Sequence, residues 1–150
     1  LAYMLAAVVR GLIVATGVFI ITVWFAQPLL HSLIWILFFA FLGSAILGTM
    51  GIIAGIWADK YDQLASFQNF LIMPATFLSG VFYTIHSLPA FWQRVSEFNP
   101  FFYLVDGFRY GFFGHSDVNP WTSFCIVSIF FLLLALLAVH LLQKGYKLRF

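Results

Sequence analysis

Asp106 and Arg109 are the two charged residues whose spacing most suggests a shared role. They stand three residues apart in a stretch that reads as helix, so their side chains can meet on one face. Glu97 lies a short way upstream, across a predicted break in the helix. Because an unpaired charge is costly in apolar surroundings, we expect these groups to pair. Two roles stay open: a structural ion pair at a membrane edge, or part of an external gate.

The histidines are the next candidates, because imidazole binds zinc and haem iron. A ligand set must converge on one point, but these residues are spread over both ends of the apolar segments. The four are His31, His86, His115 and His140. The sequence also contains no HExxH, no GxxxxGK[ST] and no plausible Ser/His/Asp arrangement. We therefore predict no metal, no cofactor and no enzyme active site, and any ATP would be bound by another chain.

The composition places the chain in a membrane. Of its 150 residues, 63% are hydrophobic and only 8% are charged, whereas a soluble domain has about 25% charged residues. The net charge of +2 is too small to indicate a nucleic-acid partner. Cys125 is the single cysteine, so no disulfide framework or thiolate metal site can form within the chain.

Long apolar segments predict an all-α integral membrane protein with four transmembrane helices. The four segments are Ala6–Phe25, Leu33–Trp57, Phe67–Tyr83 and Trp121–Leu142. The third contains Pro74, which removes a backbone hydrogen bond, so we expect a bent and short span there. The polar stretch Ala58–Ser66 before it reads as a solvated connection.

Between the last two spans we predict two short helices, Pro89–Glu97 and Pro100–Phe113. Ser87 and Asn99 can accept hydrogen bonds from a first helical turn, and Pro suits that turn because it has no N–H to lose. The helices would be roughly 14 Å and 21 Å long, whereas a hydrocarbon core needs ~30 Å. We therefore expect a re-entrant pair that enters the outer side of the membrane and returns.

A row of small residues marks one face of the second span. Their spacing of three or four keeps them on one side of a helix, where small side chains let two helices approach closely in lipid. We predict that this face packs against another helix. The row consists of Ala40, Ser44, Gly48, Gly51 and Gly55.

The basic residues indicate the orientation. With four crossings, both chain ends lie on one side, and five of the seven basic residues fall there. The positive-inside rule then places both ends in the cytosol. For Arg10, inside the first segment, two interpretations stay open: it extends to the headgroups from a helix end, or it faces a wet conduit. The five are Arg10, Lys60, Lys144, Lys147 and Arg149, and the other two are Arg94 and Arg109.

Several short motifs, taken together and in order, resemble the ABC-2-type family of exporter permeases. These are the membrane subunits of ATP-binding-cassette exporters for polysaccharides, lipid-linked glycans and drugs. The motifs are FLSGVFY at Phe77–Tyr83, Leu88-Pro89, Phe91-Trp92, Asn99-Pro100 and DGFRY at Asp106–Tyr110.

The resemblance implies a permease of six spans in a bacterial inner membrane, working as a dimer with two separate ATPase subunits. Residues 1–150 would then be a partial transmembrane domain holding the last four spans, which agrees with a chain that begins at Leu1 rather than Met. The function implied is an export path for a glycan, lipid or drug-like substrate. Two alternatives remain: a membrane-embedded redox or haem-binding subunit, and a structural membrane subunit without a conduit.

Overall fold

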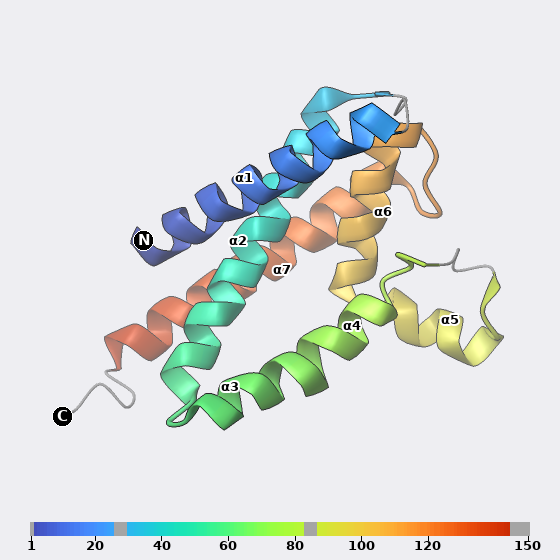
Figure 1. The fold of residues 1–150 in the computed structure, drawn as a ribbon. Coiled ribbons are helices and arrows are strands. Elements are labelled where there is room, and N and C mark those ends of the chain that lie inside the picture. Colours follow the sequence, from blue (N-terminus) through green and yellow to red (C-terminus); the bar gives the residue numbers. More distant parts are fainter. Residues whose placement is uncertain (1, 26–29, 83–86, 145–150) are drawn as a thin grey trace.

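The computed structural model describes residues 2–25, 30–82 and 87–144 (Figure 1). The described residues form helices joined by short connections, and no strand occurs among them. Three helices are long and apolar enough to cross a membrane: α1, α2 and α7. The elements are α1 (Ala2–Phe25), α2 (Leu33–Trp57), α3 (Tyr61–Phe67), η1 (Gln68–Ile72), α4 (Met73–Phe77), α5 (Ala90–Glu97), α6 (Pro100–Phe113) and α7 (Pro120–Gln143).

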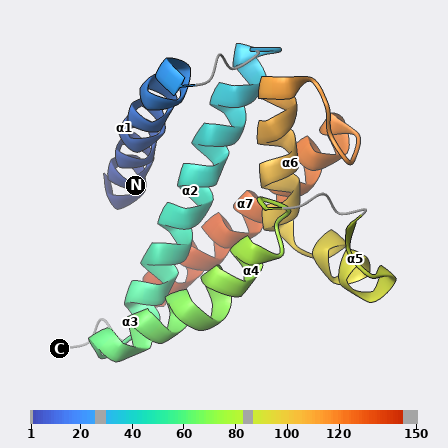
Figure 2. The same ribbon diagram turned by 45° about the vertical axis from the view of Figure 1, so that its right-hand side comes forward.

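The central element is α2, which packs against α1, α6 and α7 (Figure 2). Its 25 residues are apolar, and nine of them are buried. Because the described chain surrounds α2 and leaves α1 and α7 exposed along much of their length, the core runs along one helix. The buried core cluster consists of Phe39, Leu42, Ile46 and Met50 from α2, Phe101 from α6 and Val127 from α7.

Two glycines allow α6 to lie close against α2. A Cβ atom added at Gly111 would stand 2.7 Å from Cγ1 of Ile36 and 2.9 Å from its backbone nitrogen. A Cβ at Gly107 would collide with the ring of Phe39, which is 1% exposed. Because the two glycines are four residues apart, they lie on one face of α6 and form a small-residue contact of the kind that brings helices together in lipid.

The third predicted span differs from the structure at both ends. Tyr61–Phe77 forms one helical run through α3, η1 and α4, so the helix begins six residues before the predicted Phe67 and does not continue to Tyr83. Its 17 residues make it about 26 Å long, short of the ~30 Å hydrocarbon core. The run starts beside the end of α2 and leads to the beginning of α6 (Figure 1).

The predicted solvated connection Ala58–Ser66 is therefore wrong from Tyr61 onward. The side chain of Gln63 accepts a hydrogen bond of 2.7 Å from the backbone N–H of Asp59, which satisfies a donor at the helix start. Asp62 lies in the first turn, where a negative charge is favoured by the helix dipole. Polar residues here begin a helix rather than separate two helices.

The helical run accommodates Pro74 through a local change in its backbone hydrogen bonding. A proline has no N–H and its ring collides with the preceding turn of an α-helix. Just before it, Gln68–Ile72 forms a π-helical turn, in which the N–H of Met73 bonds to the carbonyl of Gln68, five residues back. The wider turn continues the run through the region where we predicted a bend.

The two short helices follow the sequence closely. α6 spans Pro100–Phe113, and its N-cap is Asn99, whose Oδ1 accepts a hydrogen bond of 3.0 Å from the N–H of Phe101. α5 begins at Ala90 rather than Pro89, because Pro89 itself occupies the N-cap position, without a side-chain cap.

We predict that replacing Gly111 by Ala destabilises the protein, because the added methyl group meets the backbone of α2 and cannot be accommodated by a rotamer change. Overpacking of this kind costs about 1–3 kcal/mol. Gly17→Ala is the matched control, since nothing lies within 4 Å of a Cβ there. Thermal unfolding of detergent-purified protein should show a lower midpoint for Gly111→Ala alone. Equal midpoints for both variants would contradict the close packing of α6 on α2.

Candidate functional site

Three charged side chains meet beside the C-terminal half of α6, and we call them the α6 polar cluster: Asp106, Arg109 and Asp117. Arg109 Nη2 lies 3.0 Å from Asp106 Oδ1 and 2.6 Å from Asp117 Oδ2. One guanidinium thus bridges two carboxylates, one on its own helix and one on the connection to α7. Charge-assisted hydrogen bonds of this length are stronger than neutral ones.

Asp106 also fixes the backbone of that connection. It is 1% exposed, and its Oδ1 accepts a hydrogen bond of 2.7 Å from the N–H of Asp117. Its Oδ2 accepts a longer one, 3.3 Å, from the N–H of Val118. A buried carboxylate is stable only when its oxygens have such partners. Asp106 therefore anchors the backbone of the connection between α6 and α7, in addition to pairing with Arg109.

Arg109 is held in its charged form by the cluster. Burial lowers its pKa, but the hydrogen bonds and negative charges of Asp106 and Asp117 outweigh burial, so the net pKa lies above its ordinary value. The two carboxylates therefore add to the stability of a cation that arginine carries throughout the physiological pH range.

Glu97 lies apart from this cluster. It ends α5 and is exposed, and it forms none of the ion pairs that hold Asp106 and Arg109 in the described part of the chain. Its effect falls on Tyr103, whose pKa is raised by burial and then by the negative charge of Glu97. Our expectation that Glu97 joins the ion pair is not what the structure shows; Asp117 takes that place.

The same end of α6 is joined to the start of α2. The N–H groups of His31 and Ser32 donate to the carbonyls of Phe112 and Gly111, at 3.2 Å and 2.9 Å. The last carbonyls of a helix have no partner within it, so these bonds satisfy them. Gly114 ends α6 with φ of 70°, a left-handed conformation that glycine adopts without strain.

The other end of α6 is joined to α4. Asn99, besides capping α6, donates from Nδ2 to the carbonyl of Ala75 over 2.6 Å. That carbonyl stands in the last turn of α4, where helix carbonyls need outside partners. Both ends of α6 are thus held by hydrogen bonds to other helices.

The small-residue face of α2 divides into two parts. A Cβ at Gly48 would stand 2.7 Å from that of Ala7, and a Cβ at Gly11 would collide with Ser44, so α1 packs closely there. Gly51 and Gly55 are exposed, with nothing within 4 Å of an added Cβ. Packing of that second part against another helix stays a prediction.

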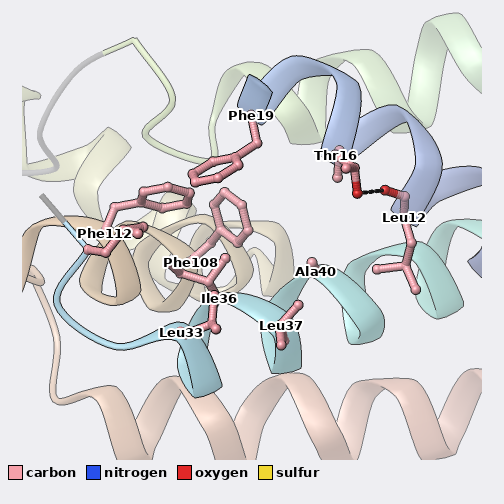
Figure 3. A pocket seen from close by; sticks show the side chains of 11 residues that line it. Leu12, Thr16, Phe19, Leu33, Ile36, Leu37, Ala40, Phe108 and Phe112 are labelled. Atoms are coloured by element: carbon pink, nitrogen blue, oxygen red, sulfur yellow. Dashed lines mark hydrogen bonds between the residues drawn. The ribbon is translucent and has the colours of Figure 1, made fainter. Parts of the chain in front are cut away.

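An apolar pocket of about 130 Å³ lies between α1, α2 and α6, near the start of α2 and the C-terminal end of α6 (Figure 3). The rings of Phe19, Phe108 and Phe112 gather at one end of it, with centroids of Phe19 and Phe112 6.0 Å apart. Ala40, the first residue of the small face, also lines it. The pocket presents hydrocarbon, so it suits an apolar chain rather than a sugar.

Three residues of this region escaped the sequence analysis. Gly107 and Gly111 form a GxxxG pattern, which is the sequence signal for the close contact between α6 and α2. Asp117 gave no signal, because its contact with Arg109 depends on how the connection folds. Of the four histidines, His86 lies outside the described residues, His31 and His115 lie near the C-terminal end of α6, and His140 lies in the last turn of α7 at the other end of the bundle.

Known proteins similar to this chain include an inner membrane transport permease and a capsule polysaccharide export protein. It is 35% identical over 147 residues to the inner membrane transport permease YadH of Escherichia coli, covering 98% of this chain and 57% of that protein. It is 29% identical to the capsule polysaccharide export inner-membrane protein BexB of Haemophilus influenzae, over 83% of this chain and 47% of that one. Nodulation protein J of Rhizobium leguminosarum is 31% identical over 63% of this chain and 38% of its own length.

The chain spans about half the length or less of most of the curated relatives it matches, with 57% for YadH and 47% for BexB. No solved structure matches it significantly. The profile of the family described as ABC-2 type transporter matches residues 1–113, which include α1 to α6 and two members of the α6 polar cluster. An all-helical chain with three membrane-length helices, such a profile match and such relatives belongs to the ABC-2 type transporter family of membrane permeases.

Proposed function

We propose that this chain is the substrate-path part of an ATP-driven exporter permease. A separate ATPase subunit would supply the energy, and a second copy of the permease would complete the path. The chain itself would perform no bond chemistry. Supporting this proposal are the family, the names of the relatives as transport permease and capsule export protein, and the architecture of α6.

The observation that carries the proposal is the placement of α6. It has 14 residues, roughly 21 Å, so it is too short to cross a bilayer. Yet it is largely buried against α2 and α7, and its ends are bonded to α4 and to the start of α2. A short helix fixed inside a bundle is tolerated at membrane depth where protein or a cavity satisfies its backbone. In the proposed permease, α5 and α6 form the re-entrant pair that closes the outer end.

The proposed orientation has four crossings, with the run from α3 to α4 as the fourth, and both ends in the cytosol. Packing of Gly11 on Ser44 places Arg10 near the middle of α2 rather than at a membrane edge, so it no longer counts toward the orientation. Without Arg10, four basic residues lie on the side of the chain ends and two lie on the other side. The positive-inside rule therefore still favours chain ends in the cytosol.

Cysteine labelling tests this orientation. With Cys125 replaced by Ser, single cysteines at Asp59, exposed before α3, and at Gln143 should react with a membrane-impermeant maleimide only after the inner face is opened. A cysteine at His115, exposed after α6, should react in intact cells. Labelling of Gln143→Cys in intact cells, with Asp59→Cys still protected, would mean an odd number of crossings between them and would overturn the re-entrant pair.

We predict that Asp106→Asn impairs export by the full-length permease, because the buried cluster loses a charge and Arg109 keeps only Asp117. The exchange Asp106→Arg with Arg109→Asp should fail to rescue export, since an arginine at position 106 cannot accept from the backbone N–H of Asp117. A hydrogen bond to a charged group contributes about 1.5–3 kcal/mol, so the thermal midpoint should fall in both. Glu97→Gln, at an exposed carboxylate outside the cluster, is the control.

Recovery of export by the charge exchange would show that Asp106 serves only as the partner of Arg109. Its hydrogen bonds to the backbone of the connection before α7 would then not be needed for export. Export at the normal rate in Asp106→Asn, with an unchanged thermal midpoint, would remove the cluster from the gate altogether.

A further inference from the structure

The helical run Tyr61–Phe77 contacts different helices at its two ends. Its first part, α3, lies against the end of α2, and its last part, α4, lies against α6 (Figure 2). The π-helical turn η1 (Gln68–Ile72) lies between them. Such turns are rare inside α-helices and are frequently found at functional sites. The π-turn therefore separates two segments that are held by different parts of the bundle.

The backbone has the least support where η1 meets α4. In an α-helix the carbonyl of Phe70 would accept a hydrogen bond from the N–H of residue 74, but Pro74 has no N–H. The N–H of Met73 bonds to the carbonyl of Gln68, five residues back instead of four. Prolines and π-turns are the usual places at which helices bend. Because both features belong to the backbone of this chain, they do not depend on which other segments pack against the run.

Beyond this junction, one side chain holds α4 in place. Asn99 donates from Nδ2 to the carbonyl of Ala75 over 2.6 Å, while its Oδ1 accepts from the N–H of Phe101 over 3.0 Å. The same amide group thus bonds the last turn of α4 and the first turn of α6. The close contacts at Gly107 and Gly111 fix α6 on α2. Through Asn99, α4 shares the fixed position of α6.

Before the junction, α3 is attached next to η1. In the described part of the chain, α3 reaches the core cluster through its last residue, Phe67, and none of its seven residues is buried. Phe67 also lines a hollow of about 390 Å³, whose other walls are the end of α2 and Leu141 of α7. A segment that is attached beside a bend can change its angle with little loss of contact, and the hollow leaves space for that movement.

We propose that η1 and Pro74 form a joint at which α3 changes its angle relative to α4, while Asn99 keeps α4 fixed to α6. The joint is a property of the fold, so it goes beyond the proposed export function and does not require it. In an exporter, it would let the segment that follows α2 move while α6 stays in place.

The test measures distances between pairs of nitroxide spin labels by pulsed electron paramagnetic resonance. Full-length protein in nanodiscs is used, with Cys125 and any other native cysteine replaced by Ser. The first pair, on cysteines at Tyr61 and Phe113, spans the joint, and the second pair, at Thr76 and Phe113, joins α4 to α6. All three positions are exposed in the described chain. The first pair should give a broader distribution of distances than the second, and equal widths would overturn the joint.

A straightened variant tests whether the π-turn causes the movement. Because a π-turn holds one residue more than an α-helical turn, deletion of Phe70 together with Pro74→Ala should produce a continuous α-helix without rotating α3 relative to α4. The first pair should then lose its excess width. Pro100→Ala is the control, since a proline in the first turn of α6 replaces an N–H that has no partner within the helix. A broad distribution that persists in the straightened variant would overturn the joint.

Asn99→Asp tests the attachment of α4, and it keeps the proposal falsifiable if the straightened variant does not fold. A carboxylate still accepts from the N–H of Phe101 at the helix start, but it has no hydrogen to donate to the carbonyl of Ala75. The second pair, between α4 and α6, should therefore give a broader distribution while α6 remains capped. An unchanged width would show that Asn99 does not fix α4 and would overturn that part of the proposal.

The joint and the proposed function have separate outcomes, because the label distances are measured without ATP or substrate. If no ATPase subunit supports export by the full-length protein, the export function fails while the distances still test the joint. If the two label pairs have equal widths in a protein that exports, the joint fails and the export function stands.

Discussion

The backbone groups at the two ends of α6 are the constraint on which the structure depends. A helix inside a membrane cannot leave its terminal N–H and C=O groups to water, so a short helix needs partners from other segments. Asn99 supplies one end and reaches α4, and the N–H groups before α2 supply the other. Once these bonds are made, α6 has one position along α2, and the connection to α7 has one anchor.

Close approach of backbones then determines how the helices pack. Gly107 and Gly111 bring α6 onto α2, and Gly11 brings α1 onto the other side of the same helix. Because lipid tails are as apolar as leucine, such fits supply more of the association between helices than hydrophobic burial does. The hollow between α1 and α6 is the space left where α2 holds both at a fixed distance.

The elements that local chemistry specifies could be predicted from sequence. The bounds of α2 follow from its apolar run, and those of α6 from Asn99-Pro100 at its start and Gly114 at its end. The start of α3 differs from the prediction, because polar residues near Asp59 are typical of a loop as well as of a helix start. Here the side chain of Gln63 accepts a hydrogen bond from the backbone N–H of Asp59 at the start of the helix. In each case the error or success lies within a few residues along the chain.

Contacts between distant segments could not be obtained in this way. The pairing of Asp106 with Arg109 follows from a spacing of three, but the third member, Asp117, is placed by the fold of a connection. The depth of Arg10 depends on which residue of α2 meets Gly11, and its position within its own segment pointed to a helix end instead. The register between two helices depends on the side chains of both, so the sequence of one segment does not specify it.

The bonds from His31 and Ser32 to the end of α6 have a consequence for the order of assembly. Their partners, Gly111 and Phe112, are made some 80 residues later in synthesis, after α1 and α2 have left the ribosome. Until α6 has been made, the N–H groups of His31 and Ser32 must therefore bind water instead of those carbonyls. Non-local closures of this kind are slow to form. The backbone hydrogen bonds between α6 and the start of α2 therefore form late in the assembly of the molecule.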